Sequence, residues 1–179
     1  VVELENYRLK PNKMQVAFVK NVMEMRAQHI DRALLLSSTG TGKSLASAFM
    51  LREMGTRRAL FIVHREQIAK QTLKSYKRVF GSSRTYGLLS GNSRELGAEF
   101  LFATMQMMSK EEIRSHYSPE DFDVIILDEC HHVGAESYQK IMQYFKPKFW
   151  LGMTASPDTN QYDIYSIFDH HIAYEIRLH

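Results

Sequence analysis

The sequence predicts an α/β fold with a mostly parallel central sheet and helices on both of its faces. Short apolar segments alternate along the chain with helix-like segments, which is typical of parallel strands joined by crossover helices. Residues 33–36 and 124–127 are apolar without interruption, as expected for strands that are buried on both faces. The chain has 179 residues, of which 44% are hydrophobic and 24% are charged. This length and composition are typical of one compact globular domain.

The predicted elements follow one another in a regular order. Met14, Phe18 and Val22 have the spacing of one helical face, so we expect a helix over residues 13–28 that begins at Asn12. The further predicted elements are a strand over 33–36, a helix over 43–54 closed by Gly55, a strand over 59–63, a helix that contains Ala69, Leu73, Tyr76 and Phe80 and ends at Gly81, strands over 85–89, 100–103 and 124–127, a helix over 136–145, and strands over 149–153 and 172–176. Residues 90–94 are polar and are predicted to form a loop.

Composition excludes several classes of protein. Lys and Arg total 23 against 20 Asp and Glu, and a net charge of +3 is too small to indicate a nucleic-acid partner. Cys130 is the only cysteine, which excludes an intramolecular disulfide and favours a reducing, cytoplasmic compartment. No apolar stretch has the length of a membrane span, so no membrane partner is expected. The chain begins at Val1 rather than Met, and we expect it to be a piece of a longer protein.

A glycine-containing loop links the first predicted strand to the helix after it. Residues 38–44 read Ser-Thr-Gly-Thr-Gly-Lys-Ser, in the strand-loop-helix context that a phosphate-binding loop requires. Its backbone amides and the helix N-terminus favour phosphate oxygens, Lys43 reaches the terminal phosphates, and Ser44 offers a hydroxyl to Mg²⁺. The predicted nucleotide-binding residues are Thr39, Gly40, Thr41, Gly42, Lys43 and Ser44.

The loop departs from the common pattern in one place. Ser37 stands six positions before Lys43, where that pattern has glycine. The alternative is an ordinary Gly-Thr turn followed by a capped helix. The surrounding strand and helix favour the nucleotide-binding interpretation.

A second apolar strand ends in two adjacent carboxylates. Asp128 and Glu129 follow residues 124–127, and an unpaired buried charge is costly, so we expect both at the carboxyl edge of the sheet. Asp128 is predicted to hold Mg²⁺ and Glu129 to orient the attacking water. An alternative makes Cys130 and the histidines at 131, 132, 170 and 171 zinc ligands, but spaced ligand pairs are missing. Cys130 is also typical of a small buried apolar residue.

Two motifs give the chain a resemblance to a known family: the phosphate loop and the Asp-Glu-Cys-His sequence. Asp128 follows Lys43 by 85 residues. The chain resembles the first RecA-like domain of superfamily 2 helicases and translocases, in the Asp-Glu-x-His branch that includes the motors of type III restriction enzymes. The resemblance extends from about residue 9 to residue 157. It implies a RecA-like P-loop fold over residues 1–179, the cofactors ATP and Mg²⁺, and a second RecA-like domain that this sequence lacks.

The resemblance assigns roles to residues outside the phosphate loop. Gln15 is similar to the glutamine that reads the adenine edge, although the family's usual spacing to the lysine is shorter. His64 and Arg65 lie in a segment similar to motif Ia, and Thr104 and Gln106 match motif Ib; both motifs contact the nucleic-acid backbone. Thr104 is equally consistent with a helix cap.

Three further residues are assigned to coupling. Thr154 and Ser156 lie in a segment similar to motif III, whose hydroxyls link the ATP site to the nucleic-acid side. His131 is implied to hydrogen-bond across the site. The family completes its ATP site with arginines from the second domain, and such an arginine contributes roughly 10³ to 10⁵ in rate. We therefore expect this domain alone to be nearly inactive.

These observations favour the ATP-binding half of a nucleic-acid-dependent ATPase, a helicase or translocase that acts on DNA. The preference for DNA depends on the restriction-motor resemblance, and an RNA helicase or RNA-sensing ATPase of the same superfamily is the alternative. A P-loop kinase explains the loop and Asp128 but leaves the motif Ia, Ib and III segments unexplained. A nucleotide-binding scaffold without turnover leaves Glu129 without a role.

The small total charge conceals a basic segment. Residues 52–84 carry nine Lys and Arg and two Glu, so this segment has a charge of +7 and the rest of the chain −4. Lys70, Lys74 and Lys77 share one face of the helix that follows motif Ia. A solvated helix face is the favoured explanation for these lysines, because lysine is mostly exposed in any protein.

Overall fold

The computed structural model describes residues 9–37, 40–128, 135–155 and 164–176. The strands are β1 (Arg32–Ser37), β2 (Ala59–Val63), β3 (Tyr86–Ser90), β4 (Ser93–Arg94), β5 (Phe100–Thr104), β6 (Val124–Asp128), β7 (Phe149–Thr154) and β8 (Ile172–Ile176). The helices are α2 (Lys13–Ala27), α3 (Gly40–Met54), α4 (Glu66–Phe80), α5 (Met105–Met108), α6 (Glu111–Arg114), α7 (Ala135–Tyr144) and α8 (Ile164–Ile167), and a 3-10 turn, η1, spans Gly81–Ser83.

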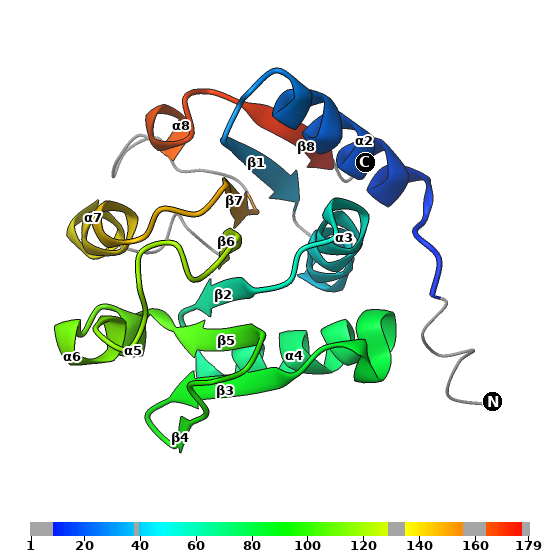
Figure 1. Ribbon diagram of the computed structural model, residues 1–179. Coiled ribbons are helices and arrows are strands. Elements are labelled where there is room, and N and C mark those ends of the chain that lie inside the picture. Colours follow the sequence, from blue (N-terminus) through cyan, green and yellow to red (C-terminus); the bar gives the residue numbers. More distant parts are fainter. Residues whose placement is uncertain (1–8, 38–39, 129–134, 156–163, 177–179) are drawn as a thin grey trace.

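One sheet contains all of these strands, in the order β4-β3-β5-β2-β6-β7-β1-β8. Every neighbouring pair is parallel except β3 with β4. Helices α2, α3 and α4 cover one face, and α5 to α8 lie on the other (Figure 1). The predicted α/β class with a mostly parallel sheet is confirmed.

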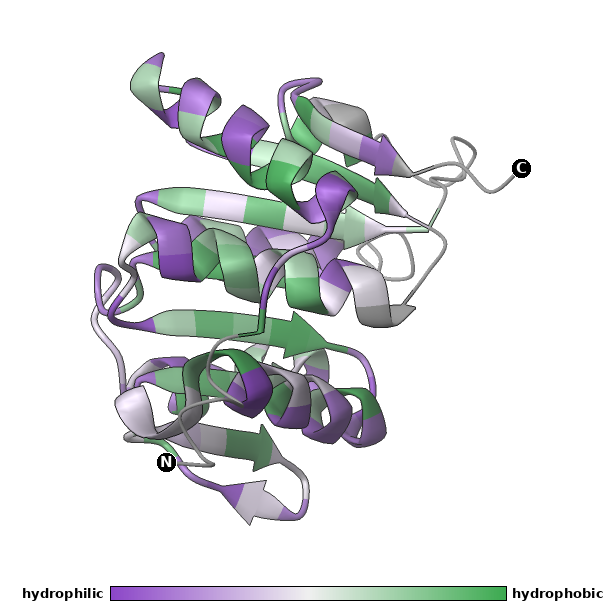
Figure 2. Ribbon diagram, turned by 90° about the vertical axis from the view of Figure 1, so that its right-hand side faces the viewer, coloured by the Kyte–Doolittle hydropathy of each residue, from purple (hydrophilic) through white to green (hydrophobic). Residues whose placement is uncertain are grey.

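Each strand buries side chains on both faces of the sheet. In β1, Leu35 belongs to the same buried cluster as Phe18 of α2, whereas its neighbour Leu34 belongs to the cluster on the opposite face, with Tyr138 of α7. Successive side chains of a strand point to opposite faces, so a strand buried on both sides is apolar at every position. Figure 2 shows the strands as mostly hydrophobic ribbons behind α2, α3 and α4.

Helix ends follow the local sequence. The Asn12 side chain accepts a hydrogen bond from the Gln15 backbone amide at 2.8 Å, and the Gln15 side chain accepts one from the Asn12 amide at 2.9 Å. This reciprocal capping box fixes the start of α2. Gly55 and Gly81 follow α3 and α4 with φ of 68° and 57°, a backbone conformation that favours glycine.

Most strand and helix ends lie within one residue of the sequence-based expectation, and the short helices α5, α6 and α8 were not predicted. Two further differences are larger. Helix α3 begins at Gly40, three residues before the predicted start, which places Lys43 inside the helix. Residues 93–94, expected in a loop, form the short strand β4, which pairs with β3 through Ser93 opposite Ser90. A two-residue polar strand at a sheet edge lacks the apolar pattern by which strands are recognised.

None of the helices in the described segments combines the length and the apolar content that crossing a bilayer needs.

Gly152 provides a test of the packing between β7 and Phe168, the residue that follows α8. A Cβ atom at this position would lie 2.5 Å from Phe168 Cζ and 2.9 Å from Leu34 Cδ2. We expect Gly152→Ala to lower the free energy of unfolding by about 1–3 kcal/mol, as overpacked cores do. Urea denaturation measures the change, and Gly97→Ala is the matched control because its Cβ would have open space. Equal stability of both variants would show that this packing is wrong.

Candidate functional site

The carboxyl edge of the sheet brings together Lys43 and Asp128. Asp128 is the last residue of β6, and Lys43 lies in the first turn of α3, which follows β1. The Lys43 ammonium nitrogen is 3.2 Å from Asp128 Oδ1, and both side chains are 4% exposed. Two residues that are far apart in sequence, and that were predicted to share a site, therefore form a buried ion pair.

A buried ion pair is weak evidence for a stabilising role. Removing two charges from water costs several kcal/mol per ion, and apolar replacements of similar volume are often as stable. The burial of Lys43 and Asp128 at this edge of the sheet therefore favours a function for their charges.

The donor set at this edge fits phosphate and magnesium. The Lys43 ammonium and the N-terminus of α3 offer positive charge to phosphate oxygens. Ser44, which is 8% exposed, and Asp128 offer the oxygen ligands that Mg²⁺ prefers. Gly40 and Thr41 lie in the first turn of the same helix. A helix that begins at Gly40 thus brings its amides and Lys43 to the same end.

Gln15 lies beside this helix start and has both ends of its amide engaged. Its Nε2 donates to the Gly42 carbonyl at 3.2 Å, and its Oε1 accepts from the Asn12 amide. Gln15 is 3% exposed. Its contact with Gly42 connects α2 to the predicted nucleotide loop, and the adenine contact stays a prediction.

The predicted nucleic-acid contacts lie along the same edge, on neighbouring strands. Val63 at the end of β2 is in register with Thr104 at the end of β5. His64, which directly follows β2, therefore lies at the same edge of the sheet as Thr104. Arg65 and Gln106 are exposed, and His64 is half-buried. The Thr104 hydroxyl accepts a hydrogen bond from the Met107 amide at 3.3 Å. The alternative role of Thr104 as a helix cap is confirmed, and the backbone contacts stay predictions.

Glu66 was missed from the sequence. Its carboxylate accepts hydrogen bonds from Ser90 Oγ at 2.5 Å and from Asn92 Nδ2 at 3.0 Å, which ties the β3–β4 turn to the start of α4. These bonds hold the pKa of the Glu66 carboxyl below its usual range, the bond from Ser90 having the largest effect. The available signal was an acid directly after Arg65, one of two glutamates in the basic segment 52–84.

Thr154 ends strand β7, which lies between β6 and β1 in the sheet. It is fully buried at the end of β7 and is in register with Leu36 of β1. Its neighbour Met153 is in register with Asp128 of β6. This placement between β1 and β6 is consistent with the predicted coupling role of Thr154, which stays a prediction.

Several predicted residues lie outside the described part of the chain: Thr39, Glu129, Cys130, His131, His132 and Ser156. His170 and His171 precede β8, and because β8 runs parallel to β1 they lie at the edge of the sheet opposite to Asp128. In the segments that the structure describes, no three His, Cys, Asp or Glu side chains gather as a metal site.

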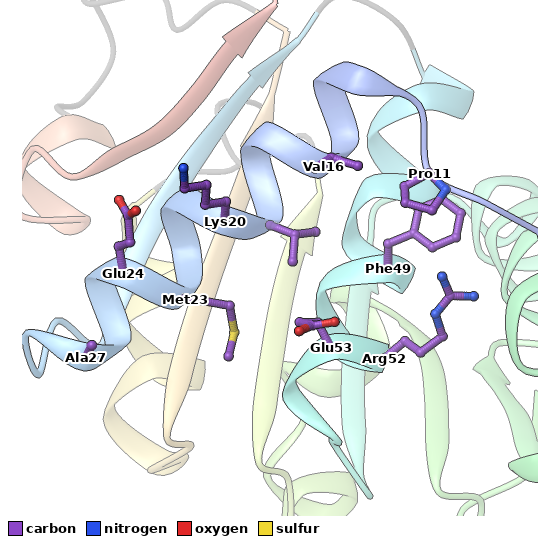
Figure 3. A pocket seen from close by; sticks show the side chains of 10 residues that line it. Pro11, Val16, Lys20, Met23, Glu24, Ala27, Phe49, Arg52 and Glu53 are labelled. Atoms are coloured by element: carbon purple, nitrogen blue, oxygen red, sulfur yellow. The ribbon is translucent and has the colours of Figure 1, made fainter.

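A groove of about 520 Å³ lies between α2 and α3 (Figure 3). Val16, Met23 and Phe49 supply its apolar wall, and Lys20 and Glu53 are among the charged residues that line it. The groove extends along both helices as far as Ala27, toward the end of α2 remote from Gln15. It does not contain the Lys43–Asp128 pair.

The buried pair provides a stability test in the absence of nucleotide. Lys43→Met keeps an apolar stem but removes the ammonium beside the Asp128 carboxylate, so we expect the free energy of unfolding to fall by about 3–5 kcal/mol. Adding Asp128→Asn removes the buried negative charge, so the double variant should lose less than the sum of the two single losses. Urea denaturation of the three variants measures this coupling, and strictly additive losses would contradict a direct interaction.

The Glu66 cluster provides a titration test. We expect the Glu66 carboxyl to titrate in NMR below the usual range of glutamate, because two donors stabilise its charged form. A lowered pKa in the folded protein means that this stabilisation exists above the unfolded-state pKa and is lost as pH falls through the folded-state pKa. Ser90→Ala should raise the midpoint, and an unchanged midpoint would exclude the hydrogen bond from Ser90.

Comparison with known proteins finds relatives among restriction enzymes and helicases. The chain is 28% identical over 159 residues to the type I restriction enzyme EcoAI endonuclease subunit of Escherichia coli, covering 82% of this chain and 19% of that protein. It is 26% identical over 147 residues to the ATP-dependent RNA helicase DHX58 of Mus musculus, covering 68% of this chain and 22% of that protein. The chain therefore spans about a fifth of the length of these relatives.

Structural comparison confirms the fold. The SWI2/SNF2 ATPase core of Sulfolobus solfataricus, solved in complex with double-stranded DNA, superposes with a TM-score of 0.73 at 14% identity, covering 91% of this chain and 36% of that chain. The predicted RecA-like architecture is thus present. The family model described as "Type III restriction enzyme, res subunit" matches residues 8–159. The chain belongs to this family, and it is an ATPase domain of the superfamily 2 helicase type.

Proposed function

We propose that this chain is the ATP-binding domain of a nucleic-acid-dependent ATPase, a helicase or translocase that acts on DNA. The observation that carries the proposal is the buried Lys43–Asp128 pair at the start of α3. The pair concentrates a cation for phosphate and an anion for magnesium at one strand edge, out of contact with water. Low exposure strengthens both interactions.

Each residue at this edge of the sheet has a role that follows from its chemistry. Bound ATP with Mg²⁺ supplies the phosphoanhydride bond to be hydrolysed. Lys43 and the first-turn amides of α3 hold phosphate oxygens, and Ser44 with Asp128 holds the metal. Glu129 orients the attacking water, and His131 and Ser156 take part with Thr154 in coupling. A second RecA-like domain of the same protein completes the site with arginine.

Nucleic acid is proposed to lie along the ends of β2 and β5. His64, Arg65, Thr104 and Gln106 contact its backbone there, which gives a grip without sequence preference. The DNA preference draws support from the EcoAI endonuclease subunit among the relatives and from the DNA-bound SWI2/SNF2 core among the structures. RNA is the second candidate, because the RNA helicase DHX58 has a similar sequence identity to this chain.

Nucleotide binding tests the role of Lys43. We expect Lys43→Ala to weaken binding of Mg-ADP at least tenfold in calorimetry, because a charge-assisted contact to phosphate is lost. The matched control is Lys110→Ala, an exposed lysine before α6 that should bind as the unmodified protein does. Equal affinity of both variants would refute the proposed phosphate site.

Turnover by the full-length protein tests both the reaction and the kind of nucleic acid on which the protein acts. We expect ATP hydrolysis to be stimulated by DNA, with Glu129→Gln retaining nucleotide binding and losing the stimulated rate by about 10²-fold or more. Single-stranded DNA, duplex DNA and RNA are compared at the same ionic strength, since phosphate contacts depend on salt. Stimulation by RNA alone would replace the DNA proposal, and phosphate transfer to a small acceptor without any stimulation would favour a kinase.

A further inference from the structure

Two buried hydroxyl groups connect α3 to α4 beneath the nucleotide site. Ser47 Oγ donates a hydrogen bond to the Ser44 carbonyl oxygen at 2.6 Å and lies 2.7 Å from the Tyr76 phenol oxygen. The one hydroxyl proton of Ser47 is used on Ser44, so the Tyr76 phenol is the donor to Ser47. The result is a directed chain of hydrogen bonds from Tyr76 through Ser47 to Ser44.

Packing does not account for the Tyr76 hydroxyl. Its ring contacts Phe102, Phe61 and Phe100 edge to face, with ring centroids 5.1, 5.9 and 5.9 Å apart. A phenylalanine would make the same ring contacts. Tyr76 is 1% exposed and Ser47 is fully buried, so each hydroxyl pays a desolvation cost that its hydrogen bonds must offset.

The chain of hydrogen bonds ends at the residue proposed to hold the metal. Ser44 directly follows Lys43 in the first turns of α3, where the site geometry is set. Burial raises the pKa of the Tyr76 phenol, the bond with Ser47 opposes this, and the nearby charge of Asp128 raises it further. The phenol therefore keeps its proton and remains a donor at any ordinary pH.

The other end of α4 lies at the proposed nucleic-acid edge. The helix begins at Glu66, directly after His64 and Arg65, and is continuous through Tyr76 to Phe80. A helix rises about 1.5 Å per residue, so Tyr76 is roughly 15 Å from the helix start along one stiff element. Any movement of α4 relative to α3 acts on the Tyr76–Ser47 bond.

We propose that Tyr76, acting through Ser47, is a positioning residue that couples nucleic-acid contact at the start of α4 to Mg-nucleotide binding at Ser44. This inference rests on the proposed function. With α4 in place, the Tyr76 donor fixes the Ser47 hydroxyl on the Ser44 carbonyl and holds the first turns of α3. A shift of α4 breaks the bond and releases this constraint on Ser44.

Linkage between the two ligands measures the coupling. In the full-length protein, the affinity for a non-hydrolysable ATP analogue with Mg²⁺ is measured with and without a DNA duplex, and the ratio of the two affinities is the coupling factor. We expect Tyr76→Phe to lower this factor about threefold or more, the size of effect that one buried hydrogen bond produces. The affinity for DNA without nucleotide should stay the same.

Two further variants separate coupling from folding. Tyr86→Phe is the matched control, because Tyr86 also packs on Phe100 but donates its hydroxyl to the Gly81 carbonyl, away from α3. It should leave the coupling factor unchanged even where it lowers thermal stability. Ser47→Ala should lower the factor as Tyr76→Phe does, and combining the two should add nothing further.

The outcomes distinguish this inference from the function on which it rests. A wild-type coupling factor that survives in Tyr76→Phe, or that falls equally in Tyr86→Phe, overturns the role of Tyr76 and leaves the ATPase proposal intact. Wild-type protein that binds no Mg-nucleotide contradicts the proposed function itself, and the inference falls with it. Wild-type protein that binds both ligands independently also overturns the inference.

Discussion

The buried ion pair between Lys43 and Asp128 sets the strictest geometric requirement at the site. Two opposite charges at 3.2 Å, each almost fully removed from water, require that β1, β6 and the start of α3 hold one fixed arrangement. Neither charge can be displaced alone without a large desolvation cost. The sheet and its helices supply the rigidity that this arrangement needs.

The two hydrophobic cores explain how that rigidity arises. Strands β1, β6 and β7 are buried on both faces, so their positions are set by α2 to α4 on one side and α5 to α8 on the other. Parallel strands end at the same edge of the sheet, so the polar side chains at those ends lie close together. Gln15 and Ser47 then connect the first turns of α3 to α2 and α4. The site is thus supported by hydrogen bonds from both neighbouring helices.

Much of this fold could be predicted from sequence because burial imposes simple patterns. The strands over 59–63 and 172–176 were predicted with their observed bounds, since each follows directly on charged or polar residues that mark its start. Strand β4 could not be predicted, because its pairing with β3 depends on backbone hydrogen bonds at an exposed edge. The early start of α3 at Gly40 was missed because glycines are poor helix formers in isolation.

The site was predictable where chemistry leaves a local motif and unpredictable where it depends on tertiary contact. Lys43 and Asp128 carry their chemistry in their immediate sequence. Glu66 and Tyr76 instead take their roles from partners 24 to 29 positions away, Ser90 and Ser47, which no local pattern reveals. Hydrogen bonds between elements are set by packing geometry, so they appear only in the folded structure.

We propose that ATP binds at the Lys43–Asp128 pair. A crystal structure of the protein with Mg²⁺ and a non-hydrolysable ATP analogue tests it most directly. We predict the Lys43 ammonium within hydrogen-bonding distance of a phosphate oxygen, and Asp128 beside the metal. A nucleotide bound elsewhere, such as in the groove between α2 and α3, with the Lys43–Asp128 pair unchanged, would contradict this account.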